Sequence, residues 1–187
     1  MMIGSLPTLA VGLCLLLHSS HSCKLSWFFE PISMLGYSSD ESRLNITGWI
    51  DRVKRGEFAF SAIIDFKYEM DNTTMIEGIA HRSASGDESD YKKLPLNIPK
   101  QPYTDFMNTH YKELVVPNLG YCSNIVQFED KFQPPWPQRV YTFNKCVSRC
   151  VGFPELFPEG FYRLVMNFSS PVDWGFKVVI KIINKLY

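Results

Sequence analysis

Alternation of apolar and polar side chains over residues 57–70 is the feature that most constrains how this chain can fold. Every even position from Phe58 to Met70 is apolar, and most odd positions are polar or charged, such as Glu57, Asp65 and Lys67. Successive side chains of a strand point to opposite faces, so this period of two gathers the apolar residues on one face. The run predicts a long strand whose apolar face the rest of the chain must cover.

Other segments extend the β pattern. Residues 44–52 read as a strand that turns near Gly56 into the first run, and residues 75–82 complete a meander. Residues 161–168 and 174–183 alternate in the same way and predict a hairpin near the C-terminus. Pro95 and Pro99 exclude a central strand or helix from residues 91–98.

One segment changes period. Pro102 suits the first turn of a helix, and the apolar residues after it recur at steps of three and four, which predicts one amphipathic helix that ends before Pro117. His110 lies on or near its apolar face, where we expect a hydrogen-bonded structural histidine. The expected fold class is therefore all-β with one helix.

The first residues indicate the compartment. Residues 1–22 carry no charged side chain, and their apolar run, 9–17, is too short to span a bilayer. Ser20 and Ser22 offer the small residues that a signal peptidase accepts, which predicts a signal peptide over 1–22 and cleavage before Cys23. A retained apolar anchor is the alternative. Residues 23–187 then form a single domain of a secreted, extracellular protein.

Four cysteines remain after the predicted cleavage: Cys23, Cys122, Cys146 and Cys150. An even number suits disulfides in an oxidising compartment, whereas a zinc site would call for paired CxxC elements or more histidines. A bond between Cys122 and Cys146 would tether the proline-rich irregular loop at 133–137 and contribute about 3 kcal/mol by loop closure. Cys23 with Cys150 is then the remaining pairing.

Three sequons predict glycosylation at Asn45, Asn72 and Asn167. Asn72 falls in a polar turn between two extended runs, where a glycan would project into water. Asn167 falls inside a predicted strand and must face outward to be modified.

Charge and motifs exclude several function classes. Lys plus Arg and Asp plus Glu balance at 19 each, so no net field favours nucleic acid or an anionic membrane. Lys177 and Lys181 interrupt the last apolar stretch, 174–183, so we expect no stable membrane insertion. The chain lacks the HExxH, GxSxG, P-loop and Rossmann patterns, so no catalytic residue, cofactor or metal site is predicted, and the protein is expected not to be an enzyme.

Aromatic residues are abundant, with 14 Phe, nine Tyr and four Trp, and they gather on the apolar faces of the predicted strands and helix. Such residues usually fill a core. A curled sheet crossed by one helix can instead form a cup whose apolar interior takes a ligand. The residues expected to line such a cavity, each of which could equally be plain core, are Phe58, Phe60, Ile64, Phe66, Tyr68, Phe106, Met107, Tyr111, Trp174 and Phe176.

A set of short segments carries a resemblance to a known family. They are SASGDESDYKK at 83–93, LP at 94–95, YK at 111–112, NLGYCS at 118–123, residues 132–137 with Cys146 after them, and PEGFY at 158–162. Together they resemble the insect CheB family of chemosensory proteins, which is similar to the ganglioside activator branch of the ML lipid-recognition superfamily.

The resemblance implies a β cup or sandwich of the ganglioside activator type with an apolar cavity. Cys122 and Cys146 match a pair that the ganglioside activators join around a loop. The last-strand cysteine of those proteins falls near 174–176, where this chain has none, so the resemblance assigns Cys23 no partner.

The resemblance also implies an extracellular protein of gustatory or pheromone perception that binds or presents a lipid or cuticular hydrocarbon. We therefore expect a non-enzymatic carrier of a hydrophobic small molecule near a sensory neuron. The alternative is an interaction module that modulates a sensory receptor or channel without a ligand. A third possibility is lipid transfer to an enzyme.

N-terminal sequencing of protein secreted from expressing cells tests the predicted cleavage. The expected first residue is Cys23, because Ser20 and Ser22 precede it at the positions that the peptidase reads. Secreted protein that still begins at residue 1 or 2 would instead indicate a retained anchor.

Overall fold

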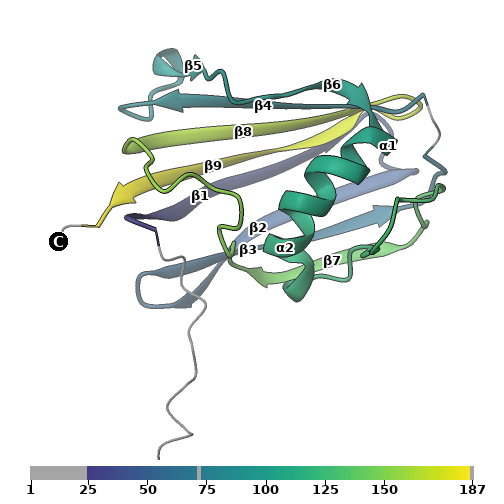
Figure 1. Cartoon of the computed structure of the whole chain (residues 1–187), viewed down its shortest axis with the longest axis horizontal. Helices are drawn as coiled ribbons and strands as arrows, with labels where there is room; N and C mark the ends of the chain where they lie inside the picture. The colour runs from purple at the N-terminus through teal and green to yellow at the C-terminus, as the bar shows by residue number, and fades with distance from the viewer. Residues whose placement is uncertain (1–24, 71–72, 186–187) are drawn as a thin grey trace, which may run out of the picture.

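Two antiparallel β-sheets and one helical segment make up the computed structural model, which describes residues 25–70 and 73–185 (Figure 1). The larger sheet has the order β1-β9-β8-β4-β5, with β6 also paired to β4, and the smaller has the order β2-β3-β7. The strands are β1 (Trp27–Ser38), β2 (Leu44–Lys54), β3 (Glu57–Phe66), β4 (Met75–Ser83), β5 (Lys92–Lys93), β6 (Ile98–Pro102), β7 (Val140–Cys146), β8 (Gly160–Ser169) and β9 (Trp174–Asn184).

The fold is all-β with one helix, as the sequence predicts. Strands β2, β3 and β4 form at the expected places, although β3 ends at Phe66 rather than Met70, and β8 and β9 form the predicted hairpin. Strands β5, β6 and β7 have no counterpart among the predicted strands. Because β5 and β6 pair only with β4, no central strand forms over residues 91–98, as expected from Pro95 and Pro99.

Strand β1 has no counterpart among the predicted strands. Its sequence, WFFEPISMLGYS, does not alternate, because its exposed side includes Phe28, Leu35 and Tyr37. A register shift between Pro31 and Ser33 also breaks the period of two. Pairing with β9 over its whole length, rather than its own pattern, makes this segment a strand.

The helical segment runs from Tyr103 to Leu119, as α1 (Tyr103–Phe106), a π-helix η2 (Met107–Val115) and α2 (Val116–Leu119). The prediction that it ends before Pro117 is wrong. Pro117 stands in the first turn of α2, where a missing N–H is tolerated. Two short 3-10 turns, η1 (Glu88–Asp90) and η3 (Gly120–Cys122), complete the helical elements of the described residues.

Two apolar clusters hold the sheets together at opposite ends of the strands. The larger, which we call the Phe66 cluster, lies under the helical segment and joins Phe66 of β3 to Ile76 of β4 and Trp174 of β9. Inside it, the Trp174 indole N–H donates to the Tyr68 hydroxyl at 2.8 Å. The smaller, which we call the Trp27 cluster, joins Trp27 of β1, Tyr162 of β8 and Ile182 of β9.

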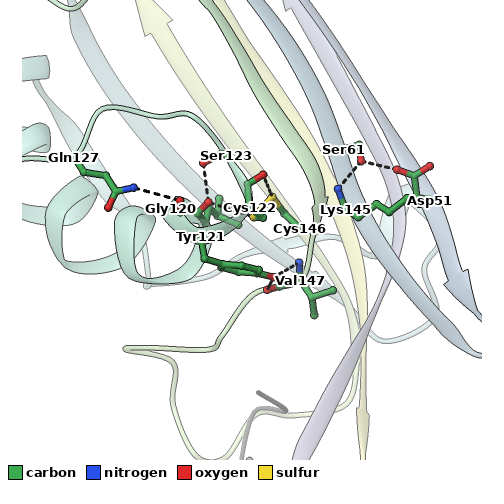
Figure 2. The surroundings of a disulfide bond; sticks show 11 residues. Asp51, Ser61, Gly120, Tyr121, Cys122, Ser123, Gln127, Lys145, Cys146 and Val147 are labelled. Atoms are coloured by element: carbon green, nitrogen blue, oxygen red, sulfur yellow. Dashed lines mark hydrogen bonds between the residues drawn. A yellow bond between two sulfur atoms is a disulfide. The ribbon is translucent and has the colours of Figure 1, made fainter. Parts of the chain in front are cut away.

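The predicted disulfide between Cys122 and Cys146 is present, with the two Cα atoms 5.4 Å apart (Figure 2). It closes the irregular stretch that contains residues 133–137, as expected. Cys150 is also disulfide-bonded, whereas Cys23, its expected partner, lies outside the described residues.

Ser61 fixes the end of β7 that carries Cys146. Its hydroxyl donates to Asp51 at 2.5 Å and accepts the backbone N–H of Lys145 at 2.9 Å (Figure 2). Lys145 adopts a left-handed φ of 49°, at the place where the register between β3 and β7 shifts. This bulge places Cys146 against Cys122 at the end of the helical segment.

Replacing both Cys122 and Cys146 by serine should lower the free energy of unfolding by about 3 kcal/mol, because the open chain gains the entropy of the released loop. Urea unfolding of the folded variant and the parent measures the difference. An unchanged unfolding midpoint would show that the bond does not constrain the unfolded chain.

Candidate functional site

The strand register shows which side chains face the space between the two sheets. Phe168 pairs with Trp174 and Leu164 with Val178, all at even positions of β8 and β9. Phe168 and Trp174 belong to the Phe66 cluster or pack against it, so even positions of these strands face inward. The same reasoning places the even positions of β2 and β3 inward. We call this surface the inner face.

The middle of the inner face belongs to neither cluster. On β8, Met166 packs against the Phe66 cluster and Tyr162 belongs to the Trp27 cluster, but Leu164 between them is in neither. On β9, β2 and β3 there are likewise inward side chains that belong to neither cluster. We define the middle apolar surface as six partly accessible inward side chains of these four strands that neither cluster contains: Ile50, Phe58, Phe60, Leu164, Phe176 and Val178. The inward alanines Ala62 of β3 and Ala80 of β4, also outside both clusters, are buried.

These side chains are partly accessible although they point between two sheets. Leu164 is 37% exposed, and its strand is flanked by β4 and β9, so the accessible area belongs to the side chain. Phe58 is 38% exposed, and the other four are half-buried. Inward residues of a close-packed sandwich would be nearly inaccessible, because protein interiors pack as densely as organic crystals. The opposite sheet therefore does not fully cover these six side chains.

Glycines allow the two sheets to approach each other closely along the edge formed by β1 and β2. A Cβ at Gly48 of β2 would lie 2.8 Å from the Met34 side chain of β1, and one at Gly36 would lie 2.6 Å from Ile46. Strands β1 and β2 thus approach as closely as backbones allow, and Figure 1 shows them side by side. From this line the two sheets extend in different directions, β9 and β8 on one side and β3 and β7 on the other.

The ten residues predicted to line a cavity fall into two groups. Phe58, Phe60 and Phe176 lie on the middle apolar surface. The other seven belong to the Phe66 cluster or pack against it: Ile64, Phe66, Tyr68, Phe106, Met107, Tyr111 and Trp174. The prediction did not include Ile50, Leu164 and Val178, although the alternation in their strands indicates that they face inward.

Three groups with shifted pKa values, Tyr111, Tyr141 and His81, lie outside the middle apolar surface. Burial raises the pKa of Tyr111, whose hydroxyl donates to the Val126 carbonyl at 2.6 Å. Burial also raises the pKa of Tyr141. Both phenols therefore stay neutral near pH 7. His81 points outward opposite Arg163, and its pKa is lowered by burial and by the charges of Arg163 and Lys93.

His110 has the structural role expected of it. It lies on the π-helix, with its ring stacked on Phe106 at 6.0 Å between centroids and its Nδ1 hydrogen-bonded to Thr109. In residues 25–70 and 73–185, no three side chains of His, Cys, Asp or Glu gather as metal ligands.

Two surface hollows lie away from the middle apolar surface. One of about 370 Å³ is lined by residues that include Ser26, Leu156 and Phe157. A second of about 250 Å³ lies beside Phe161 and Lys181. Neither is lined by any of the ten residues predicted from the sequence.

The sequons differ in accessibility. Asn45 is exposed and faces outward on β2, whereas Asn167 faces outward on β8 but is half-buried, with its amide oxygen accepting the Tyr37 hydroxyl at 2.6 Å. Asn72 lies outside the described residues. No helix within the described residues has both the length and the apolar character to cross a membrane.

Residues 77–164 match a family model described as "Protein of unknown function (DUF1091)". The matched stretch begins in β4, contains the helical segment and the Cys122–Cys146 disulfide, and ends at Leu164 in β8. No curated protein matches the chain. The matched family model assigns no activity to this stretch.

Substitutions at Leu164 and Phe66 should separate accessible surface from packed core. Leu164→Trp should change the free energy of unfolding by less than about 1 kcal/mol, since its side chain has room. Phe66→Ala should lower it by about 3–5 kcal/mol, because it leaves a cavity in a buried cluster. Urea unfolding measures both, and a loss of about 2 kcal/mol or more in Leu164→Trp would reveal overpacking of a filled interior.

Proposed function

We propose that this protein is a secreted, non-enzymatic carrier that binds a hydrophobic ligand, such as a lipid or cuticular hydrocarbon, on the middle apolar surface. The observation that carries the proposal is the accessibility of Leu164, an inward side chain of a central strand. The six side chains of the surface are all apolar, and the two core clusters lie at its two ends.

Burial alone can supply the affinity. A ligand that removes about 400 Å² of apolar surface from water gains about 10 kcal/mol at roughly 25 cal/mol per Å². Loss of translational and rotational freedom costs about 4 kcal/mol or more, which leaves up to about 6 kcal/mol, a dissociation constant of tens of micromolar. Such a site needs few polar groups.

The chemosensory part of the proposal rests on the resemblance to the insect CheB family. One resembling segment, 83–93, has a structural role in this fold: the Asp90 carboxylate accepts hydrogen bonds from the backbone N–H of Ala84 and Ser85 and from the Ser83 hydroxyl. These bonds lower the pKa of Asp90. The segment therefore shapes a loop at the end of β4.

A second candidate function has its own observation. The outward side of β1 bears apolar side chains that are largely exposed, with Phe28 at 42% and Leu35 at 56%, and Ile32 and Tyr37 beside them. Exposed apolar patches often mark protein contacts. This surface supports the alternative of an interaction module that modulates a receptor or channel.

Uptake of N-phenyl-1-naphthylamine, an uncharged fluorescent apolar compound, tests the carrier proposal on protein freed of lipid by organic extraction. The parent should bind it, and Leu164→Trp should reduce binding at least about tenfold by filling the surface while leaving the fold intact. Leu156→Trp is the matched control, because Leu156 is 81% exposed and lies off the inner face.

Native mass spectrometry of secreted protein before and after extraction should show a mass that the extraction removes. Absence of bound lipid together with no uptake of the dye would contradict the proposal and favour the interaction module. Extraction of lipid from vesicles would place the protein with lipid-transfer activators instead.

A further inference from the structure

Cations occupy one end of the inner face. Arg52 of β2 pairs with Phe58, and Arg82 of β4 pairs with Tyr162, so both arginines take inward positions in the register. Lys92 of β5 pairs with Arg82 and shares its face. On the described strands β1 to β5 and β7 to β9, no Asp or Glu takes a paired inward position.

These cations lie at the end of the inner face away from the Phe66 cluster. Arg52 is six residues beyond Ile46, and Arg82 is six residues beyond Ile76, where Ile46 and Ile76 mark the Phe66 cluster on each sheet. The middle apolar surface lies between that cluster and the cations. The intervening strand length is about 20 Å, the extended length of a chain of roughly sixteen carbons.

Neither arginine forms an ion pair with an acidic side chain of the described residues. Within the described part of the chain, the ion pairs join Lys54 to Glu57, Lys67 to Asp65 and Arg163 to Glu88. Arg52 is exposed. Arg82 donates from Nη2 to the Glu159 carbonyl at 2.6 Å, and its buried Nε has no hydrogen-bond partner.

We propose that the ligand of the inner face is an anionic amphiphile, with its chain on the middle apolar surface and its carboxylate or phosphate head group beside Arg52. This inference rests on the proposed function, since it needs an apolar ligand on that surface. A carboxylate or phosphate gains charge-assisted hydrogen bonds from guanidinium groups. A neutral hydrocarbon gains nothing from them, and a cationic head group is repelled.

Three ligands with the same chain and different head groups test the charge. Hexadecanoate, hexadecan-1-ol and hexadecylamine, each below its aggregation concentration, compete with N-phenyl-1-naphthylamine for the extracted protein. Hexadecanoate should bind about three- to tenfold more tightly than the alcohol, and the amine most weakly, as expected for one or two partly solvated ionic contacts. Raising the salt to about 0.5 M should reduce only the advantage of the anion.

Arg52→Gln should bring hexadecanoate to the affinity of the alcohol and leave the alcohol unchanged. Arg55→Gln is the matched control, because Arg55 lies one turn away in the β2–β3 hairpin, outside both strands. Arg52 is exposed, so its replacement should leave the fold intact.

The outcomes separate this inference from the proposed function. Equal affinity for all three head groups would overturn the inference and leave the apolar carrier standing. Failure of all three to displace the dye would overturn both. A palmitoyl lysophosphatidate arm identifies the source of the anion, since tighter binding than hexadecanoate indicates a phospholipid and weaker binding indicates a free fatty acid.

Discussion

The ring of Phe66 lies where both sheets and the helical segment meet. Its centroid is 4.6 Å from that of Tyr68, 6.4 Å from that of Tyr141 on β7 and 6.5 Å from that of Trp174 on β9. The helical segment adds Phe106 and Tyr111 to the same cluster. Because aromatic side chains bury large areas and prefer these edge and tilted geometries, this contact fixes the angle between the sheets at one end.

That angle, together with the line along which β1 and β2 converge, determines which inward side chains stay accessible. Gly36 and Gly48 permit the close approach at that line, and the Phe66 cluster holds the sheets together at the end under the helical segment. The Trp27 cluster lies on the larger sheet and the segment before β8, where the Trp27 ring packs against Phe157. It meets the smaller sheet where Phe29 of β1 stacks on Phe60 of β3, with ring centroids 6.5 Å apart. The six side chains of the middle apolar surface are left partly accessible.

Much of this arrangement can be read from the sequence, because it depends on local patterns. Alternation located β3, β4, β8 and β9, and the helical period located the helix. Strand β1 could not be found in this way, because its strand structure depends on pairing with β9, which is distant in sequence. The π-helix is also hidden, because Tyr103, Met107 and Tyr111 are spaced four residues apart, which fits an ordinary helix as well.

The candidate site was predicted less completely than the fold, for a related reason. Alternation tells which side chains face inward, but whether an inward side chain is packed or accessible depends on what lies opposite. Phe66 and Phe60 occupy equivalent positions in the pattern of one strand, yet Phe66 is buried under the helical segment and Phe60 lies half-buried against Phe29. What lies opposite each ring distinguishes them, and that is a property of the whole fold.

The proposed site would bind its ligand through two kinds of interaction, apolar contact and the charge of an arginine. The six side chains of the middle apolar surface do not titrate, so their contribution to binding does not depend on pH. Arginine stays protonated throughout the range in which proteins are stable, so the positive end is equally constant. Any pH dependence of binding must then come from the ligand: a carboxylic acid would lose its ionic contact as the pH falls through its own pKa, and a hydrocarbon would bind alike at every pH.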